Sequence, residues 1–189
     1  MILTRPKILE EIKKCNIVIE PFDIKHLGPA SYDIALSSQF RVFYDKVHDK
    51  DKLNKKSMDN KNQLNTLTTI ELKPDYNIND YTKSIKAEHY TLKPGEFILG
   101  ISEERIQLAE NIAAFLTGRS RYARLGLVVH ATANFIQPGV NNKQVLEIRN
   151  LSHRTLVLTA GLRIAQIIFI RCEANAKYQG RYKDQCSII

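Results

Sequence analysis

The sequence predicts an all-β fold, either a sandwich or a barrel of short strands. Short runs rich in β-branched and aromatic residues recur along the chain, and Gly, Pro and Asn residues separate them. Only one stretch, near the N-terminus, has apolar residues at helical spacing. Many short strands joined by close turns, with a single clear helix, are typical of β-sandwiches and barrels.

The helix is expected from Thr4 to about Cys15, with Thr4 as its N-cap. Pro6 suits the first turn, and Ile8 and Ile12 lie on one helical face. The strands expected after it are Ile17–Glu20, Ser31–Leu36 continued by Phe40–Phe43, Thr69–Leu72, Tyr90–Leu92, Phe97–Gly100, Glu103–Leu108, Asn111–Leu116, Val145–Ile148, Arg154–Leu158 and Ile164–Ile170.

Residues from about 45 to 65 are rich in Lys, Asp and Asn and offer little to a core. We expect them to form an exposed insertion within a single domain of residues 1–189. The formal net charge is +8, with 28 Lys and Arg against 20 Asp and Glu, which favours an anionic partner. The basic residues beside Gly118 are compact and mixed with Gly and Ser, whereas a nucleic-acid footprint is usually a broad stripe interleaved with exposed aromatics, so the phosphates of a small molecule are favoured.

The cysteines predict a reducing compartment. The three of them, Cys15, Cys172 and Cys186, are odd in number and widely spaced, which predicts neither a disulfide framework nor a metal quartet. The N-terminus lacks the apolar core of a signal peptide, and no apolar run approaches the ~20 residues that span a bilayer. We therefore expect a cytoplasmic protein without a membrane partner.

An arginine-rich turn, Gly118–Leu127, is a candidate phosphate grip. It places Arg119, Arg121 and Arg124 around Ser120. A guanidinium group is always charged and presents a fork of donors that matches phosphate oxygens, and Ser120 adds a hydroxyl group. The alternative is a solvated surface turn, which is the more frequent role of such a stretch taken alone.

A single carboxylate, Glu147, lies inside the apolar run Val145–Ile148. An acid in an apolar strand is costly unless it is paired or placed in a cleft. Burial would suit such a carboxyl to accept and release protons. The alternative is an edge-strand glutamate that faces water.

Taken together, the motifs resemble the dCTP deaminase branch of the trimeric dUTPase superfamily. They occur in the family's order over nearly the whole chain, apart from the Lys-rich insertion. The matching stretches are Met1–Leu3, Ile19–Phe22, Gly28–Asp33, Leu92–Glu96, Gly118–Leu127, His130–Ala133, Val145–Asn150, Arg163–Gln166 and Tyr178–Gln185.

The resemblance implies a distorted jelly-roll fold, a homotrimer with active sites at subunit interfaces, and hydrolytic deamination of dCTP to dUTP and ammonia in pyrimidine deoxynucleotide (dUMP/dTTP) biosynthesis. It also implies Mg²⁺ bound through the triphosphate, and dTTP as a candidate inhibitor. Glu147 matches the catalytic glutamate, and a C-terminal segment at about 174–189 is expected to close on the nucleotide. The substrate-binding residues implied are Arg119, Ser120, Arg121, Tyr122, Ala123, Arg124, Ala133, Gln137, Val145, Leu146, Tyr178, Arg181 and Gln185.

The chain departs from the family pattern at Ile136–Gly139, where relatives carry Ile-Asp-Pro-Gly and this chain has Gln137. The family's aspartate contacts the deoxyribose, and in the phosphate-cleaving branch it helps to position water. Gln137 can hydrogen-bond a sugar hydroxyl but cannot accept a proton as a carboxylate does. Phe135 replaces a polar residue of some members, Val140–Lys143 replaces an aromatic-x-Gly motif, and Arg181 stands where others often have lysine.

Zinc is not expected. Zinc-dependent cytidine deaminases carry His-x-Glu and Pro-Cys-x-x-Cys motifs. No histidine of this chain has Glu two residues later, and the closest cysteines, Cys172 and Cys186, are too far apart for Cys-x-x-Cys. Three hypotheses therefore follow: a zinc-independent dCTP deaminase, a bifunctional enzyme that also cleaves dUTP to dUMP, and a nucleotide-binding homologue without turnover.

Overall fold

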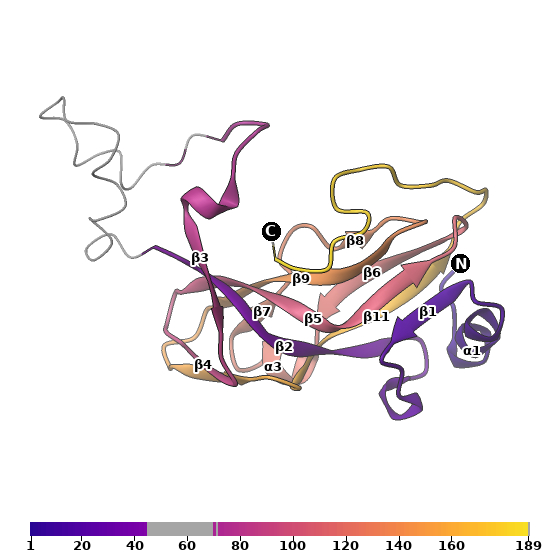
Figure 1. Cartoon of the computed structure of the whole chain (residues 1–189). Helices are drawn as coiled ribbons and strands as arrows, with labels where there is room; N and C mark the ends of the chain where they lie inside the picture. Colours follow the sequence, from indigo (N-terminus) through magenta and orange to yellow (C-terminus); the bar gives the residue numbers. More distant parts are fainter. Residues whose placement is uncertain (45–69, 71, 189) are drawn as a thin grey trace, which may run out of the picture.

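The computed structural model describes residues 1–44, 70 and 72–188 of the chain. Its strands form a curled antiparallel sheet, which confirms the predicted all-β class (Figure 1). The strands are β1 (Ile17–Glu20), β2 (Tyr32–Phe43), β3 (Thr82–Lys86), β4 (His89–Leu92), β5 (Phe97–Leu108), β6 (Ile112–Gly118), β7 (Leu127–Val129), β8 (Phe135–Ile136), β9 (Asn141–Asn150), β10 (Leu156–Thr159) and β11 (Arg163–Arg171). The helices are α1 (Arg5–Lys13) and α3 (Ser120–Ala123), with 3-10 turns η1 (Ile24–His26) and η2 (Ile78–Asp80).

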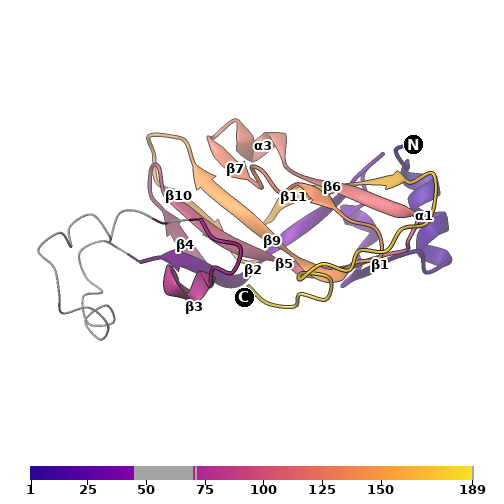
Figure 2. The same cartoon turned by 90° about the horizontal axis from the view of Figure 1, so that it is seen from above.

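Within the described residues, the main sheet has the strand order β7-β9-β5-β2-β11-β6-β8, with β1 paired to β5 and β3 paired to β2. Strands β4 and β10 form a separate two-stranded antiparallel sheet. Helix α1 lies at one end of the molecule beside β1, and β3 and β4 lie at the other (Figure 2). The core between the curled faces is apolar, and its largest fully buried side chains are Tyr32, Phe40 and Phe169.

Most of the expected elements are confirmed, and the differences have local causes. The helix begins after Thr4 as predicted, although the Thr4 side chain makes no capping hydrogen bond. The strand expected at Thr69–Leu72 is wrong for its described residues, because Ile70 and Leu72 belong to no strand and Leu72 is 91% exposed. The insertion expected at about 45–65 lies outside the described residues. Within the residues that the structure describes, no helix is both long and apolar enough to cross a bilayer.

One carboxyl group lies buried where two strand pairings shift register. Glu104 on β5 is 2% exposed, and both of its carboxyl oxygens accept from the N–H of Ala35 on β2, at 3.2 and 2.9 Å. The pairing of β5 with β9 shifts between Ile101 and Arg105 beside it. Burial raises the pKa of Glu104 to about 7, although the bonds from Ala35 act in the opposite direction.

Glu104 predicts a pH-dependent stability. Its pKa is about 7 when folded against 4.5 unfolded, so between these values the unfolded chain releases a proton that the folded chain keeps. The free energy of unfolding is therefore expected to fall as pH rises through this window, by at most about 1.4 kcal/mol per pH unit. Urea unfolding of the wild type and of Glu104→Gln between pH 5 and pH 8 tests this. The variant should lose most of this slope, and an equal slope in both proteins would contradict it.

Candidate active site

The side chains of β9 alternate between the core and a cleft. Leu146 and Ile148 are fully buried, whereas Val145 and Glu147 are partly exposed on the opposite face and line the cleft. The expectation that Glu147 is buried among apolar neighbours is therefore wrong, because strand alternation directs it away from the core. The side chain of Leu146, a predicted substrate-binding residue, lies in the core, so only its backbone could contact a ligand.

The carboxylate of Glu147 is held by the loop that follows β7. The Thr132 backbone N–H donates to Oε2 at 2.9 Å, and the Thr132 hydroxyl donates to the same oxygen at 3.0 Å. The chain reaches this position because His130 adopts a positive φ of 65° just after β7. The Nε2 atom of His130 lies 2.7 Å from the carbonyl oxygen of Ala133, which fixes the loop. Glu147 is thus a partly exposed carboxylate in a defined orientation.

A cleft of about 400 Å³ opens beside Glu147, and it brings together residues that are distant in sequence. The predicted site residues that line it are Ala133, Gln137, Val145, Glu147, Tyr178 and Gln185. The lining also includes residues that were not predicted, among them Tyr76, Ile78, His130, Lys143 and Tyr182. One elongated ligand could therefore contact the carboxylate and the C-terminal segment together.

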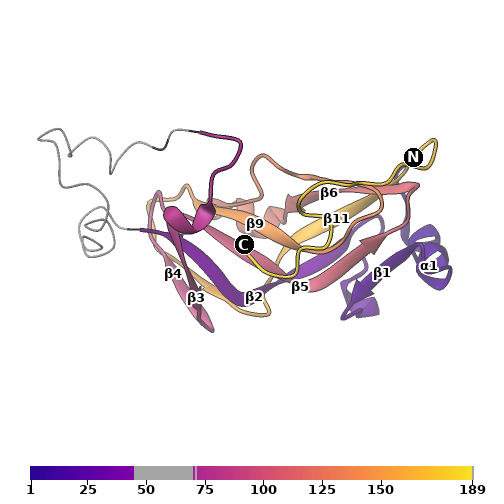
Figure 3. The same ribbon diagram turned by 45° about the horizontal axis from the view of Figure 1, so that its top comes forward.

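The C-terminal segment docks along the first part of β9 (Figure 3). The N–H groups of Asn141 and Lys143 donate to the carbonyl oxygens of Lys183 and Gln185, at 2.9 and 2.8 Å. The C-terminal segment that is expected to close on the nucleotide thus lies against β9 and contributes Tyr178, Tyr182 and Gln185 to the cleft. The predicted residue Arg181 is exposed, with its guanidinium carbon 5.8 Å from the ring centroid of Tyr182.

The N–H and C=O groups of Val145 point to the edge of β9 along which the C-terminal segment docks. Peptide groups along a strand point alternately to its two sides. On this side the tail pairs with Lys143, and the His130 N–H donates to the Glu147 carbonyl at 2.7 Å. Val145 lies between these two bonds, where no backbone partner is present among residues 1–44, 70 and 72–188. Its N–H and C=O are thus placed to bind a flat polar ring beside the carboxylate.

The arginine-rich stretch lies elsewhere. It begins where β6 ends, forms α3 and packs against β7, which pairs with the far end of β9. Figure 2 shows α3 and the C-terminal segment on opposite sides of the molecule. None of the predicted grip residues Arg119, Ser120, Arg121, Tyr122, Ala123 and Arg124 lines the cleft. The structure therefore does not bring the two halves of the predicted site together within one chain.

The members of this stretch differ in what they contact. Arg119 forms an ion pair with Asp33, with Nη2 and Oδ2 2.9 Å apart, and donates to the Arg163 carbonyl at 3.2 Å. Tyr122 packs against the core. In contrast, Ser120, Arg121, Ala123 and Arg124 are exposed. Arg119 and Tyr122 thus anchor the turn, and Arg121 and Arg124 project from it.

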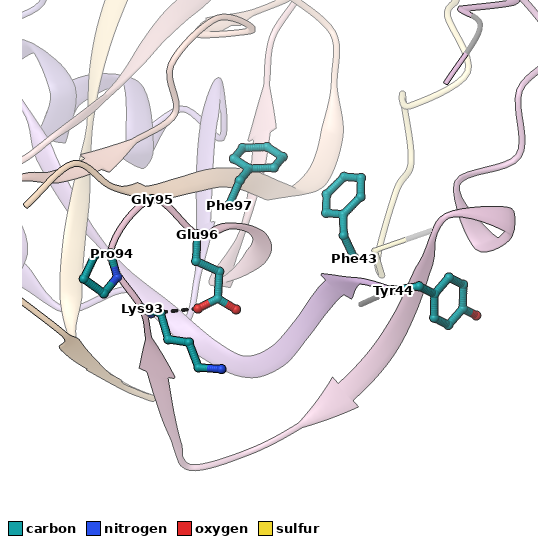
Figure 4. A pocket seen from close by; sticks show the side chains of 7 residues that line it. All are labelled: Phe43, Tyr44, Lys93, Pro94, Gly95, Glu96 and Phe97. Atoms are coloured by element: carbon teal, nitrogen blue, oxygen red, sulfur yellow. Dashed lines mark hydrogen bonds between the residues drawn. The ribbon is translucent and has the colours of Figure 1, made fainter. Parts of the chain in front are cut away.

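A second, larger cavity of about 600 Å³ lies at the turn between β4 and β5 (Figure 4). It is lined by Phe43, Tyr44 and Lys93–Phe97. Its one carboxylate, Glu96, already accepts from the Lys93 N–H at 2.7 Å and from the Tyr90 hydroxyl. These bonds shape the turn, and no predicted site residue reaches this cavity. The cleft beside Glu147 is therefore the better candidate for chemistry.

The described part of the chain contains no group of three or more His, Cys, Asp and Glu side chains placed to hold a metal ion. The three cysteines are free thiols.

Comparison with known proteins identifies the family. A family model described as dCTP deaminase-like matches residues 2–172. The chain belongs to this family. A dCTP deaminase, dUMP-forming, from a Nocardioides species is 32% identical over 195 residues, covering 98% of this chain and 91% of that protein. A dCTP deaminase from Halorubrum lacusprofundi is 30% identical over 196 residues, covering 98% of this chain and 87% of that protein.

The fold is also that of the family. The crystal structure of 2'-deoxycytidine 5'-triphosphate deaminase from Agrobacterium tumefaciens matches with a TM-score of 0.62 at 19% identity. The match covers 89% of this chain but 48% of the Agrobacterium chain, so this chain spans about half of that protein. The predicted all-β fold of a dCTP deaminase is confirmed.

Proposed function

We propose that the protein is a dCTP deaminase that hydrolyses dCTP to dUTP and ammonia, with Glu147 as the proton shuttle. The observation that carries this proposal is the oriented carboxylate of Glu147, held by Thr132 beside the uncommitted backbone of Val145 in one cleft. Family membership supplies the substrate class, because both relatives described above are named dCTP deaminases.

The chemistry requires one group that can first accept and then donate protons. Water adds to C4 of the cytosine ring, N3 takes up a proton, the C4–N4 bond breaks, and ammonia leaves. The Glu147 carboxylate would take one proton from water and pass it to N3. It would then take the second proton from the new C4 hydroxyl and pass it to the amine, so that C4 becomes a carbonyl as ammonia leaves. The two bonds from Thr132 keep the carboxylate oriented during these transfers.

The cleft provides the remaining contacts for a nucleoside. In this proposal the backbones of Ala133 and Val145 bind the pyrimidine edge, and the Gln137 amide binds the deoxyribose hydroxyl. Tyr178, Arg181 and Gln185 belong to the segment that covers the nucleotide. Asn141 and Lys143 hold that segment in place through their N–H groups.

The phosphate grip would come from a neighbouring subunit. Ser120, Arg121 and Arg124 are exposed and do not line the cleft of their own chain, and α3 lies on the side of the molecule opposite the C-terminal segment (Figure 2). In a homotrimer with sites at its interfaces, this stretch of one subunit would reach the triphosphate bound by the next. The +8 net charge favours such an anionic ligand.

Mg²⁺ would enter with the substrate. Magnesium keeps several waters and binds nucleotide phosphates with few protein ligands, so the lack of a carboxylate cluster in the described residues fits this mode. No residue of the chain is assigned to it. Zinc independence, action in the cytoplasm and inhibition by dTTP remain predictions from the sequence.

A second candidate activity is cleavage of dUTP to dUMP, because the Nocardioides relative is named dUMP-forming. Gln137 argues against it, since an amide cannot accept a proton from water. Incubation with dCTP and, separately, with dUTP, followed by separation of dCTP, dUTP, dUMP and ammonia, distinguishes these hypotheses. We expect dUTP and ammonia in equal amounts from dCTP. Production of dUMP would support the bifunctional enzyme, and tight binding without products would support a nucleotide-binding homologue.

A further inference from the structure

A buried arginine on β2 connects the C-terminal segment to the rest of the protein. Arg41 is 6% exposed, and its Nη2 donates to the Ile188 carbonyl at 3.1 Å. Its Nη1 donates to Asn79 Oδ1 at 2.6 Å and to Thr82 Oγ1 at 3.0 Å. No carboxylate of the described residues lies within ion-pair distance of this guanidinium group. A buried guanidinium group depends on such acceptors for its stability.

The partners of Arg41 belong to two walls of the candidate active site. Asn79 lies in the segment of residues 72–81, which also contributes Tyr76 and Ile78 to the cleft. Ile188 is the last described residue of the C-terminal segment, and its side chain is 7% exposed and lines the same cleft. Arg41 is therefore hydrogen-bonded to both of the segments that form these walls.

A second contact joins the same two segments. Tyr76 and Tyr182 interact through their side chains within the cleft lining, and this hydrogen bond raises the pKa of Tyr76. The backbone carbonyl of Tyr182 accepts from Asn142 Nδ2 at 2.7 Å. The C-terminal segment is thus attached at three levels: to β9, to the segment of residues 72–81, and to Arg41 at its far end.

We propose that Arg41 is a positioning residue that fastens the C-terminal segment over the cleft and thereby sets how long a nucleotide stays bound. The identity of the nucleotide rests on the proposed function, but the attachment itself does not. A guanidinium group can serve acceptors on separate elements at once, whereas an ammonium group is a more compact donor. Arg41→Met replaces the arginine with an apolar side chain of similar length and removes every hydrogen-bond donor of the guanidinium group. Arg41→Lys keeps the positive charge.

Hydrogen exchange measures the attachment without any substrate. The amides of Asn141 and Lys143 are protected by the tail carbonyls, whereas those of Leu146 and Ile148 belong to the part of β9 that pairs with β5. In Arg41→Met we expect exchange at Asn141 and Lys143 to accelerate about 10- to 100-fold, with Leu146 and Ile148 unchanged. Arg41→Lys should show a smaller acceleration, and the exposed control Arg154→Met should show none.

The outcomes separate the attachment from general stability. Ile188→Ala removes the apolar anchor at the chain end and is expected to accelerate the same two amides. If Arg41→Met accelerated exchange throughout β9, the substitution would have destabilised the whole sheet. The test of the attachment would then be whether Ile188→Ala accelerates exchange at Asn141 and Lys143 alone. Unchanged protection of Asn141 and Lys143 in Ile188→Ala and in a folded Arg41→Met protein would overturn the proposal.

The rate of nucleotide release tests the second part of the proposal, that Arg41 sets how long the nucleotide stays bound. In a Glu147→Gln background, which would prevent turnover, adding Arg41→Met should raise the dissociation rate of dCTP about 10-fold or more while the association rate changes little. Faster amide exchange with an unchanged dissociation rate would overturn the role in nucleotide retention. If the parent protein did not bind dCTP, the proposed function would fail, and the exchange experiment would still decide the attachment.

Discussion

Glu147→Gln is expected to lower ammonia release from dCTP by about 100- to 10,000-fold, with dCTP binding nearly unchanged. The amide has the shape of the carboxyl group and can still accept from Thr132, so the loop after β7 should keep its position. It cannot take a proton from water or return one to the amine. The measurement is steady-state ammonia release together with dCTP affinity by calorimetry.

The matched control is Glu103→Gln. Glu103 is an exposed carboxylate on β5 and does not line the cleft. This variant should retain wild-type turnover, because only its surface charge changes. Turnover retained in Glu147→Gln would reject Glu147 as the proton shuttle, and equal losses in both variants would point to a general charge effect.

Arg124→Ala is expected to weaken dCTP binding by about 10- to 100-fold and to leave the affinity for the nucleoside deoxycytidine unchanged. The reason is that Arg124 is exposed and does not line the cleft of its own chain, so in the proposed trimer it would contact the triphosphate of a ligand bound by a neighbouring subunit. Competition binding with both ligands checks this. Arg154→Ala, another exposed arginine, should affect neither ligand. Equal losses for nucleotide and nucleoside would contradict a phosphate role.

Mixing the Arg124→Ala and Glu147→Gln variants tests whether the site is shared between subunits. Arg124→Ala and Glu147→Gln subunits are unfolded together in equal amounts and refolded, and turnover is measured at a dCTP concentration well below saturation, where weak binding limits the Arg124→Ala protein. If each site takes Glu147 from one subunit and Arg124 from the next, random assembly should restore about one quarter of the wild-type activity. If both residues acted within one chain, no mixed site would contain both, and activity would stay at the level of the separate variants.

The local chemistry of the sequence was sufficient for much of the fold. The first helix follows from Thr4, Pro6 and the spacing of Ile8 and Ile12, and the apolar runs locate most strands. Strand β3 was missed because its sequence, Thr-Lys-Ser-Ile-Lys, has little apolar character. It forms because β2 offers a partner edge, and this is tertiary information that a local pattern does not contain.

The sequence could predict which residue types belong to the site, but not where the fold would place them. The sequence singled out Glu147, which is partly exposed, whereas Glu104 in the polar run Glu103-Glu104-Arg105 is only 2% exposed. Which acid is buried depends on which face each strand turns to the core, and Glu104 lies on the face of β5 that is buried along the whole strand. Likewise, proximity in sequence could not show that the arginine-rich stretch does not line the cleft beside Glu147. No sequence motif marked Arg41 or Tyr76 as a functional residue.

A crystal structure of Glu147→Gln bound to dCTP would test the central claim most directly. We expect the side chain at position 147 to lie within about 3 Å of N3 or the 4-amino group of the cytosine. The ring should lie against the backbone of Val145, and the triphosphate should meet Arg124 of a neighbouring subunit. A cytosine ring bound away from position 147, for example between Phe43 and Phe97, would contradict the account.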